Sequence, residues 1–295
     1  MKPLFLVLLA FATLAAQAES LIAPGATLKK LAGGFAFTEG PTCDANGNLY
    51  FTDQPNNRIL KWSIRGKLSV WLQPAGRVNG MMFDAQGNLI ACAEQRNELW
   101  SIATNKTVTV LVTNVDGRNL NGPNDLWIAP NGGIYLTDPY YQRSYWDHQT
   151  KALAGEDVYY LAPDRKTLTR AAGDLRKPNG ITGTPDGKHL FVADIGAGKT
   201  WKYDIQPDGS LTNKTLFCAL GSDGMTIDAE GNVYLTGRGV TVFDAGGKEI
   251  ERIDVPEGWT ANVSFSGADH QMLFITASKS VYSIRLRVKG ANAAK

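Results

Sequence analysis

Apolar and polar residues alternate in short runs along most of the chain, and the runs come in pairs around a glycine-containing turn. Six such turns align with one another: DANGNLYFTD from residue 44, DAQGNLIACAE from 84, APNGGIYLTD from 129, TPDGKHLFVAD from 184, DAEGNVYLTG from 228 and a degenerate GADHQMLFITA from 267. Alternation with a period of two predicts β-strands, and the Asp/Asn-x-Gly turns supply the positive φ that tight hairpins need. The pattern therefore predicts an all-β chain of repeated hairpins.

The spacing of the repeats predicts the architecture. The glycines at 47, 87, 132, 187 and 231, and His270 in the sixth place, are 40, 45, 55, 44 and 39 residues apart. Two further apolar strands follow most hairpins, and four antiparallel strands per repeat are typical of a β-propeller blade. We therefore predict a single six-bladed β-propeller over residues 19–295. The last repeat shows only three strands, and residues 26–33 can supply the fourth and close the ring. A β-sandwich is the alternative, but sixfold repetition argues against it.

An oxygen-bearing side chain stands eight residues before each turn position. These six residues are Glu39, Asn79, Asn124, Asn179, Asp223 and Asn262. Each would head the innermost strand of its blade, so that the six would meet in a ring around the propeller axis. Carboxylate and amide oxygens without cysteine or histidine favour a hard cation. We expect one divalent cation, with calcium favoured and zinc, manganese or magnesium as alternatives. The simpler alternative is that Asn and Asp only cap turns at the strand starts.

A second set of carboxylates is predicted one layer outside this ring, where the second strand of a blade ends. It consists of Asp53, Glu94, Asp138 and Asp194. Such residues can be ordinary turn formers. Asp138 is the strongest candidate for chemistry because an unusual insertion, PYYQRSYWDHQTKALAGED at residues 139–157, follows it and accounts for the long 55-residue step.

The insertion is rich in aromatic and polar side chains. Its candidates for substrate contact are Tyr140, Arg143, Trp146 and His148, together with Asn79 and Asn124 from the ring. Long loops in compact domains are usually functional or disordered, and the aromatic content argues against disorder. We expect the insertion to form a wall or lid over a pocket, with an oligomer contact as the alternative.

Composition and the N-terminal segment narrow the expected location and partners of the protein but do not indicate its function. The stretch MKPLFLVLLAFATLAAQA at 1–18 has the basic start, apolar middle and small-x-small end of a secretory signal peptide, which predicts an exported, periplasmic or secreted protein without a membrane anchor after cleavage. With 30 basic and 28 acidic residues and no long basic run, nucleic acid is disfavoured as a partner. The three cysteines fit no zinc motif, and their spacing leaves a disulfide between any two of them open.

Four motifs together give the chain a family resemblance. TEGPTCDANGNLYFTD, NGPNDLWIAPNGGIYLTDPYY, KPNGITGTPDGKHLFVAD and SDGMTIDAEGNVYLTG resemble the SMP-30/gluconolactonase/luciferin-regenerating-enzyme family. The resemblance implies a six-bladed propeller with one divalent cation, often calcium, and lactone hydrolysis. It implies Glu39, Asn179 and Asp223 as metal ligands and Asn124 as a ligand or substrate contact. Animal members carry an arginine before the Asn-Asp pair where this chain has Pro123, and Arg143 could supply a substitute cation.

The combined hypothesis is a metal-dependent lactonase. The cation would polarise the lactone carbonyl, and Asp223 or, second, Asp138 would take a proton from the attacking water. No G-x-S-x-G motif is present, so a serine mechanism has little support. Alternatives are an aryl-esterase or phosphotriesterase with similar metal chemistry, and an exported propeller that only binds and keeps a structural metal. A small-molecule lactone or ester is the expected partner, and the protein is expected to be a monomer or small homo-oligomer.

Overall fold

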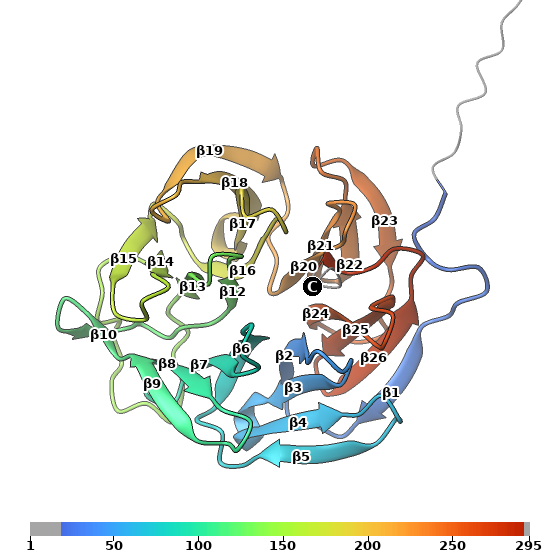
Figure 1. Cartoon of the computed structure of the whole chain (residues 1–295), viewed down its shortest axis with the longest axis horizontal. Helices are drawn as coiled ribbons and strands as arrows, with labels where there is room; N and C mark the ends of the chain where they lie inside the picture. Colours follow the sequence, from blue (N-terminus) through green and yellow to red (C-terminus); the bar gives the residue numbers. More distant parts are fainter. Residues whose placement is uncertain (1–18, 292–295) are drawn as a thin grey trace, which may run out of the picture.

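The computed structural model describes residues 19–291 and forms a ring of six four-stranded antiparallel sheets (Figure 1). We number these blades 1 to 6 by the chain order of their innermost strands. Blade 1 holds β2 (Thr38–Cys43), β3 (Leu49–Asp53), β4 (Arg58–Trp62) and β5 (Leu68–Leu72). Blade 2 holds β6 (Val78–Phe83), β7 (Leu89–Ala93), β8 (Glu98–Ile102) and β9 (Val108–Val112). Blade 3 holds β12 (Leu126–Ile128), β13 (Ile134–Asp138), β14 (Asp157–Leu161) and β15 (Leu168–Ala172).

The second half of the chain repeats the arrangement. Blade 4 holds β16 (Pro178–Gly183), β17 (His189–Asp194), β18 (Lys199–Ile205) and β19 (Leu211–Cys218). Blade 5 holds β20 (Met225–Ile227), β21 (Val233–Gly237), β22 (Gly239–Phe243) and β23 (Glu249–Ile253). Blade 6 holds β24 (Thr260–Ser266), β25 (Met272–Ala277), β26 (Ser280–Arg285) and β1 (Lys29–Gly33). A small two-stranded sheet, β10 (Asn114–Val115) with β11 (Arg118–Asn119), and two short 3-10 turns, η1 (Gln54–Asn56) and η2 (Ile195–Ala197), complete the elements.

The ring closes as the sequence predicts. The N-terminal strand β1 pairs antiparallel with β26, with Lys29 opposite Ser283 and Gly33 opposite Ser280. Blade 6 therefore joins the two ends of the chain, and both β1 and β26 gain a hydrogen-bonded neighbour. This strand exchange fastens the first blade to the last. The six-bladed prediction is confirmed.

The hairpin turns keep the same geometry in all six blades. The turn glycines have positive φ, for example 79° at Gly47 and 87° at Gly231. Histidine replaces glycine in the sixth turn, and His270 still has a φ of 54°. The Asp44 carboxylate accepts the backbone N–H groups of Asn46 and Asn48, which shows how the first residue of the motif fixes the turn. The degenerate sixth repeat is therefore in register with the others.

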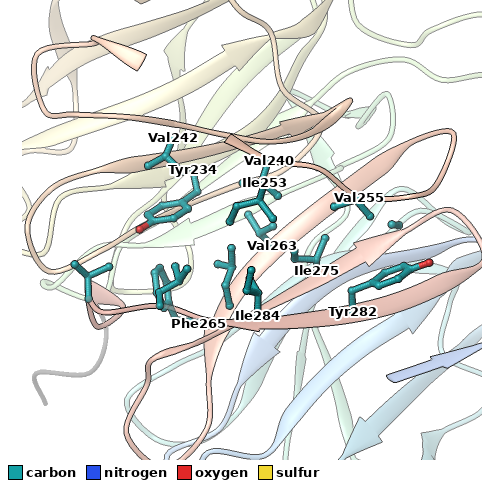
Figure 2. Close-up of a cluster of buried hydrophobic side chains, with 14 residues drawn as sticks. Tyr234, Val240, Val242, Ile253, Val255, Val263, Phe265, Ile275, Tyr282 and Ile284 are labelled. Atoms are coloured by element: carbon teal, nitrogen blue, oxygen red, sulfur yellow. The ribbon is translucent and has the colours of Figure 1, made fainter. Parts of the chain in front are cut away.

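The hydrophobic core lies between neighbouring blades. Figure 2 shows one cluster, where Tyr234, Val240 and Val242 of blade 5 face Val263 and Phe265 of blade 6. The rings of Tyr234 and Phe265 meet edge to face with centroids 5.3 Å apart. Because each blade packs on both neighbours, the sheets hold the heads of the innermost strands at fixed positions around the axis.

Some expectations concern features outside these blades. The predicted signal peptide lies outside the described residues. Across residues 19–291 no helix has the length and apolar character needed to span a membrane. Cys43, Cys92 and Cys218 are all free thiols. The insertion at 139–157 connects β13 to β14, whose ends Asp138 and Asp157 lie opposite each other.

Candidate functional site

The six residues found by counting lie at the same end of the six innermost strands. We call them the ring positions. Glu39, Asn79, Asn179 and Asn262 lie within the first three residues of β2, β6, β16 and β24. Asn124 and Asp223 lie two residues before β12 and β20, which are only three residues long. Five of the six side chains are buried, and Asp223 keeps partial exposure.

Two ring positions carry carboxylates without a basic partner. Among the described residues, Glu39 accepts hydrogen bonds only from its neighbour Gly40 N (2.8 Å) and Asn262 Nδ2 (3.2 Å). Asp223 accepts from Asn179 Nδ2 (2.8 Å) and Trp259 Nε1 (2.6 Å). Neither forms an ion pair within the described part of the chain. Glu39 is therefore a buried carboxylate and Asp223 a largely buried one, and neither is paired with a basic side chain.

The electrostatics of these two groups follow from that arrangement. Burial raises the pKa of Glu39 well above its usual range, and the nearby Asp223 and Asp125 carboxylates raise it further. Burial also raises the pKa of Asp223 to about 6, against the opposing effect of its hydrogen bonds from Trp259 and Asn179. A divalent cation bound by both carboxylates would offset their mutual repulsion and would supply each with an opposite charge.

Asn179 gives an independent indication of a cation site. Its Nδ2 donates to Asp223 Oδ1 at 2.8 Å and to the Tyr141 hydroxyl at 3.0 Å. Its Oδ1 is buried and has no hydrogen-bond partner among residues 19–291. Buried polar oxygens are nearly always satisfied, so an unpartnered one suggests an ion or water at this place. Glu39, Asn179 and Asp223 thus present oxygens whose chemistry fits a hard cation.

The remaining ring positions differ from one another. Asn79 donates from its Nδ2 to Glu94 Oε1 at 2.9 Å, so this hydrogen bond does not use its amide oxygen. Asn262 donates to Glu39 and, at 3.4 Å, to Asp125. Asn124 is buried, but its side chain makes no hydrogen bond to another described residue. No group of three or more His, Cys, Asp or Glu side chains gathers at metal-holding distance within residues 19–291, so a cation here would depend on amide oxygens as well.

The counting rule missed two residues of the site. Asp125 is buried beside Asn262, it accepts from its neighbour Leu126 N at 2.9 Å, and burial raises its pKa to about 7. Trp259 orients Asp223 through its indole N–H. The Asn-Asp pair in NGPNDL was a usable signal for Asp125. Nothing in the sequence around Trp259 marked it, because it lies in the loop before β24.

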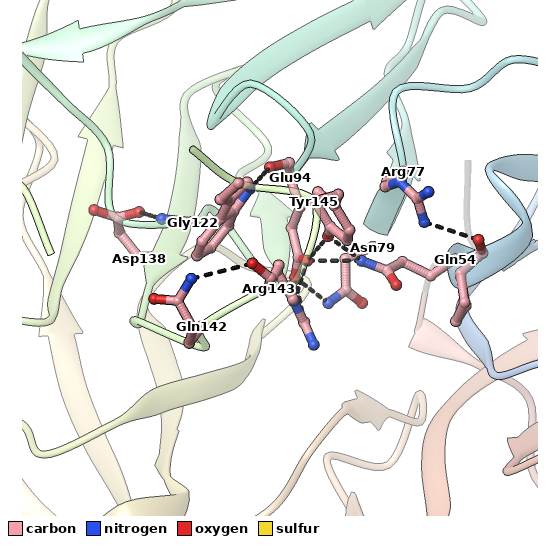
Figure 3. Close-up of polar contacts among 11 residues, drawn as sticks. Gln54, Arg77, Asn79, Glu94, Gly122, Asp138, Gln142, Arg143 and Tyr145 are labelled. Atoms are coloured by element: carbon pink, nitrogen blue, oxygen red, sulfur yellow. Dashed lines mark hydrogen bonds and ion pairs between the residues drawn. The ribbon is translucent and has the colours of Figure 1, made fainter. Parts of the chain in front are cut away.

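Asp138 has a different environment from the ring. Its Oδ2 accepts from Asn121 N at 2.9 Å and its Oδ1 from Gly122 N at 2.8 Å (Figure 3). Asp53 and Asp194 make the same paired contacts with the loops before β2 and β16. We call Asp53, Asp138 and Asp194 the bracket carboxylates. A catalytic role for Asp138 stays a prediction, and the contacts that the structure gives it hold a loop in place.

Residues 139–157 cross the ring face from blade 3 to blade 2, and we call them the strap. The Arg143 guanidinium donates two hydrogen bonds to buried Glu94, both at 2.8 Å (Figure 3). Tyr145 donates its hydroxyl to Glu94 Oε2 at 3.0 Å, and Trp146 donates its indole N–H to the Glu94 carbonyl at 2.8 Å. Gln54 of blade 1 also donates to Glu94, at 2.7 Å. Glu94 therefore fastens the strap across the face.

The strap residues predicted to contact substrate lie in different places. Arg143 is close enough to Asp223 that its charge lowers the pKa of that carboxylate. Trp146 is buried and anchors the strap. Tyr140 donates its hydroxyl to exposed Gln142, and His148 stacks on Trp146 with ring centroids 4.9 Å apart. Of these four, the structure brings Arg143 nearest to the ring, and it adds Tyr141, which the sequence analysis did not select.

Comparisons with known proteins agree with this geometry. The sequence model of the SMP-30/gluconolactonase/LRE-like region matches residues 37–279. The chain belongs to this family. It is 28% identical to a gluconolactonase of Zymomonas mobilis over 302 aligned residues, covering 92% of this chain and 85% of the relative.

Solved structures show the same fold. A gluconolactonase from Xanthomonas campestris superimposes with a TM-score of 0.84 at 30% identity, covering 90% of this chain and 91% of that one. A calcium-binding protein, regucalcin, from Agrobacterium tumefaciens has a TM-score of 0.75 at 20% identity over 90% of this chain and 95% of that one. The first supports common family membership, and the second shows a shared fold.

Proposed function

We propose that this protein is a divalent-cation-dependent hydrolase that opens lactone rings, with Ca²⁺ as the cation. The observation that carries the proposal is the pair of unpartnered carboxylates, Glu39 and Asp223, beside the orphaned Oδ1 of buried Asn179. Oxygen-only ligands favour calcium over softer metals. The relatives named gluconolactonases, at 28% and 30% identity, support a lactone as substrate.

Glu39, Asn179 and Asp223 would hold the cation, and Asn124 is placed to add an oxygen. When bound, the cation would supply Lewis-acid polarisation of the lactone carbonyl. Asp223 would accept a proton from the attacking water, because it is a carboxylate at the rim of the ring whose two oxygens are already oriented. Trp259 and Asn179 hold its two oxygens by hydrogen bonds and so fix its direction.

The strap would form the wall that selects the substrate. Arg143 stands on this wall with its charge matched by Glu94, so the pair presents polar hydrogen-bonding groups without net charge. Hydrogen bonds from such groups suit the hydroxyls of a sugar-type lactone. We also propose export for the chain, on the pattern of residues 1–18, which fractionation of the natural source would test.

The test joins metal analysis to a substrate panel. Purified protein should contain or bind calcium, should hydrolyse gluconolactone or a simple γ-lactone, and should lose this activity with a chelator and regain it with calcium. Asp223→Ala should abolish both metal binding and hydrolysis. Unchanged activity in Asp223→Ala would overturn the scheme. Turnover of aryl esters or phosphotriesters alone would favour those substrates, and tight metal binding without turnover would favour a binding propeller.

A further inference from the structure

Tyr141 lies on the strap and contacts a proposed metal ligand directly. Its hydroxyl is 3.0 Å from Asn179 Nδ2, and the same nitrogen is 2.8 Å from Asp223 Oδ1. An ionised carboxylate can only accept, so the amide of Asn179 must turn its nitrogen toward Asp223. The nitrogen therefore donates to Tyr141 as well, and the tyrosine oxygen is the acceptor in that contact.

This leaves the proton of the Tyr141 hydroxyl without a partner. Within residues 19–291 the Tyr141 hydroxyl takes part in this hydrogen bond and donates none. The other strap tyrosines are different: Tyr145 donates to Glu94, and Tyr140 donates to Gln142. A tyrosine hydroxyl has an ordinary pKa of about 10, so it carries its proton at neutral pH. A free donor thus lies beside Asn179 and Asp223, where a substrate of the proposed reaction would bind.

Two basic side chains lie over the ring of Tyr141. The Lys177 ammonium lies 4.5 Å from its centroid and the Arg143 guanidinium 5.6 Å. Arg143 is in turn fixed by the two hydrogen bonds to buried Glu94. The attraction between a cation and an aromatic face favours one orientation of the ring. The hydroxyl is therefore pre-positioned, as a catalytic donor should be.

We propose that Tyr141 is a catalytic residue that donates a hydrogen bond to an oxygen of the lactone's ester group. The inference rests on the proposed lactonase function. In that reaction water adds to the carbonyl carbon, the ring C–O bond breaks, and the proton lost by water ends on the released hydroxyl group, which gives a hydroxy acid. Negative charge builds on the ester oxygens along this path. Tyr141 stabilises that charge and keeps its own proton.

The variant Tyr141→Phe tests this role with little structural change. It removes only the hydroxyl, and its ring still faces Lys177 and Arg143. The matched control is Tyr160→Phe on blade 3, because the Tyr160 hydroxyl likewise accepts from an asparagine amide, Asn131 Nδ2 at 3.3 Å, and that turn lies at the opposite end of the blade from the ring. Metal affinity and thermal unfolding are measured for both variants beside kcat and KM on a lactone that the wild type hydrolyses.

We expect Tyr141→Phe to lower kcat by roughly tenfold to a hundredfold, because the hydrogen bond strengthens as charge develops. Its metal affinity should stay within about twofold of the wild type, and Tyr160→Phe should keep kcat and KM. A Tyr141→Phe enzyme with wild-type kcat and KM would overturn the inference while leaving the lactonase proposal intact. A loss of metal affinity in proportion to activity would also overturn it, since Tyr141 would then act only on Asn179. If the wild type hydrolyses no lactone, both proposals fail.

Discussion

Two buried carboxylates at the open end of one hairpin, Glu39 and Asp53, have opposite surroundings. Asp53 lies opposite Thr38 in the pairing of β2 with β3, one residue from Glu39. It accepts hydrogen bonds from Ala36 N at 2.9 Å and Asn56 Nδ2 at 2.8 Å, and it forms an ion pair with Arg58 at 2.7 Å. No basic side chain among residues 19–291 pairs with Glu39, and burial and two other carboxylates raise its pKa.

The difference separates a carboxylate whose contacts stabilise the fold from one whose burial costs stability. Asp53 satisfies donors that would otherwise be buried unpaired, so its burial helps the protein fold. Glu39 satisfies one N–H of its neighbour and one amide, while its charge remains unmatched. Burial of such a group lowers stability, and a protein keeps it where a ligand supplies the missing charge. Asp138 lies between these two cases: it accepts two backbone N–H groups of its loop, but it forms no ion pair within residues 19–291, and burial raises its pKa to about 7.

The largest expected effect comes from Glu39→Gln. We expect metal affinity to fall at least about a hundredfold and lactone kcat/KM to fall at least about as much, because a ligand worth several kcal/mol is lost. The chelated, metal-free protein should be as stable as the wild type or slightly more stable, since the variant removes a buried unpaired charge. Calcium titration, steady-state kinetics and urea unfolding with chelator check the three parts. Retained metal affinity would show that Glu39 is not a ligand.

The reverse pattern is expected from Asp53→Asn. The free energy of unfolding should fall by about 2–3 kcal/mol, because Arg58 and the backbone donors lose a charged partner. Arg58 is about a quarter exposed, at 26%, so water offsets part of the loss. Metal affinity and the kcat of the folded protein should stay within about twofold, which urea unfolding and calcium titration would show. A large loss of metal affinity with unchanged stability would show that Asp53 acts like a ring residue, and the distinction between bracket carboxylates and ring positions would be wrong.

Much of this arrangement could be predicted from the sequence because it repeats. The turn motif and the period-two strands give the blades, and counting eight residues back from each turn finds Glu39 and Asp223. The count assigns one residue per blade, so it passes over Asp125, which follows Asn124 into a strand of only three residues. Tyr141 could not be placed, because the path of the strap depends on contacts with Glu94 and Lys177 from other blades. The sequence could not show that Asp138 accepts two backbone N–H groups of its loop, and its catalytic role stays a prediction.

Glu94 combines features of the two classes. It follows β7 as Asp53 ends β3, yet the loop before its inner strand β6 is held by another residue: Asn57 Oδ1 accepts Ala75 N at 2.9 Å and Arg77 N at 2.8 Å. The Glu94 carboxylate therefore does not bind the loop before its blade. It accepts hydrogen bonds from Arg143 of the strap and from Asn79 instead. We infer that Glu94 acts on the reaction only through the groups it holds.

Glu94→Gln should therefore give the smallest and most selective effect. Without the charge that matches Arg143, the strap should loosen, and trypsin should cut after Arg143 or Lys151 several times faster. Misplacement of the strap should lower lactone kcat/KM by about tenfold. Metal affinity should hardly change, because Glu39, Asn179 and Asp223 keep their own contacts. A strap cut at the wild-type rate would show that Trp146, which donates to the Glu94 backbone carbonyl, holds it without the Glu94 carboxylate. A loss of metal affinity would show that Glu94 contributes to cation binding, as the ring positions do.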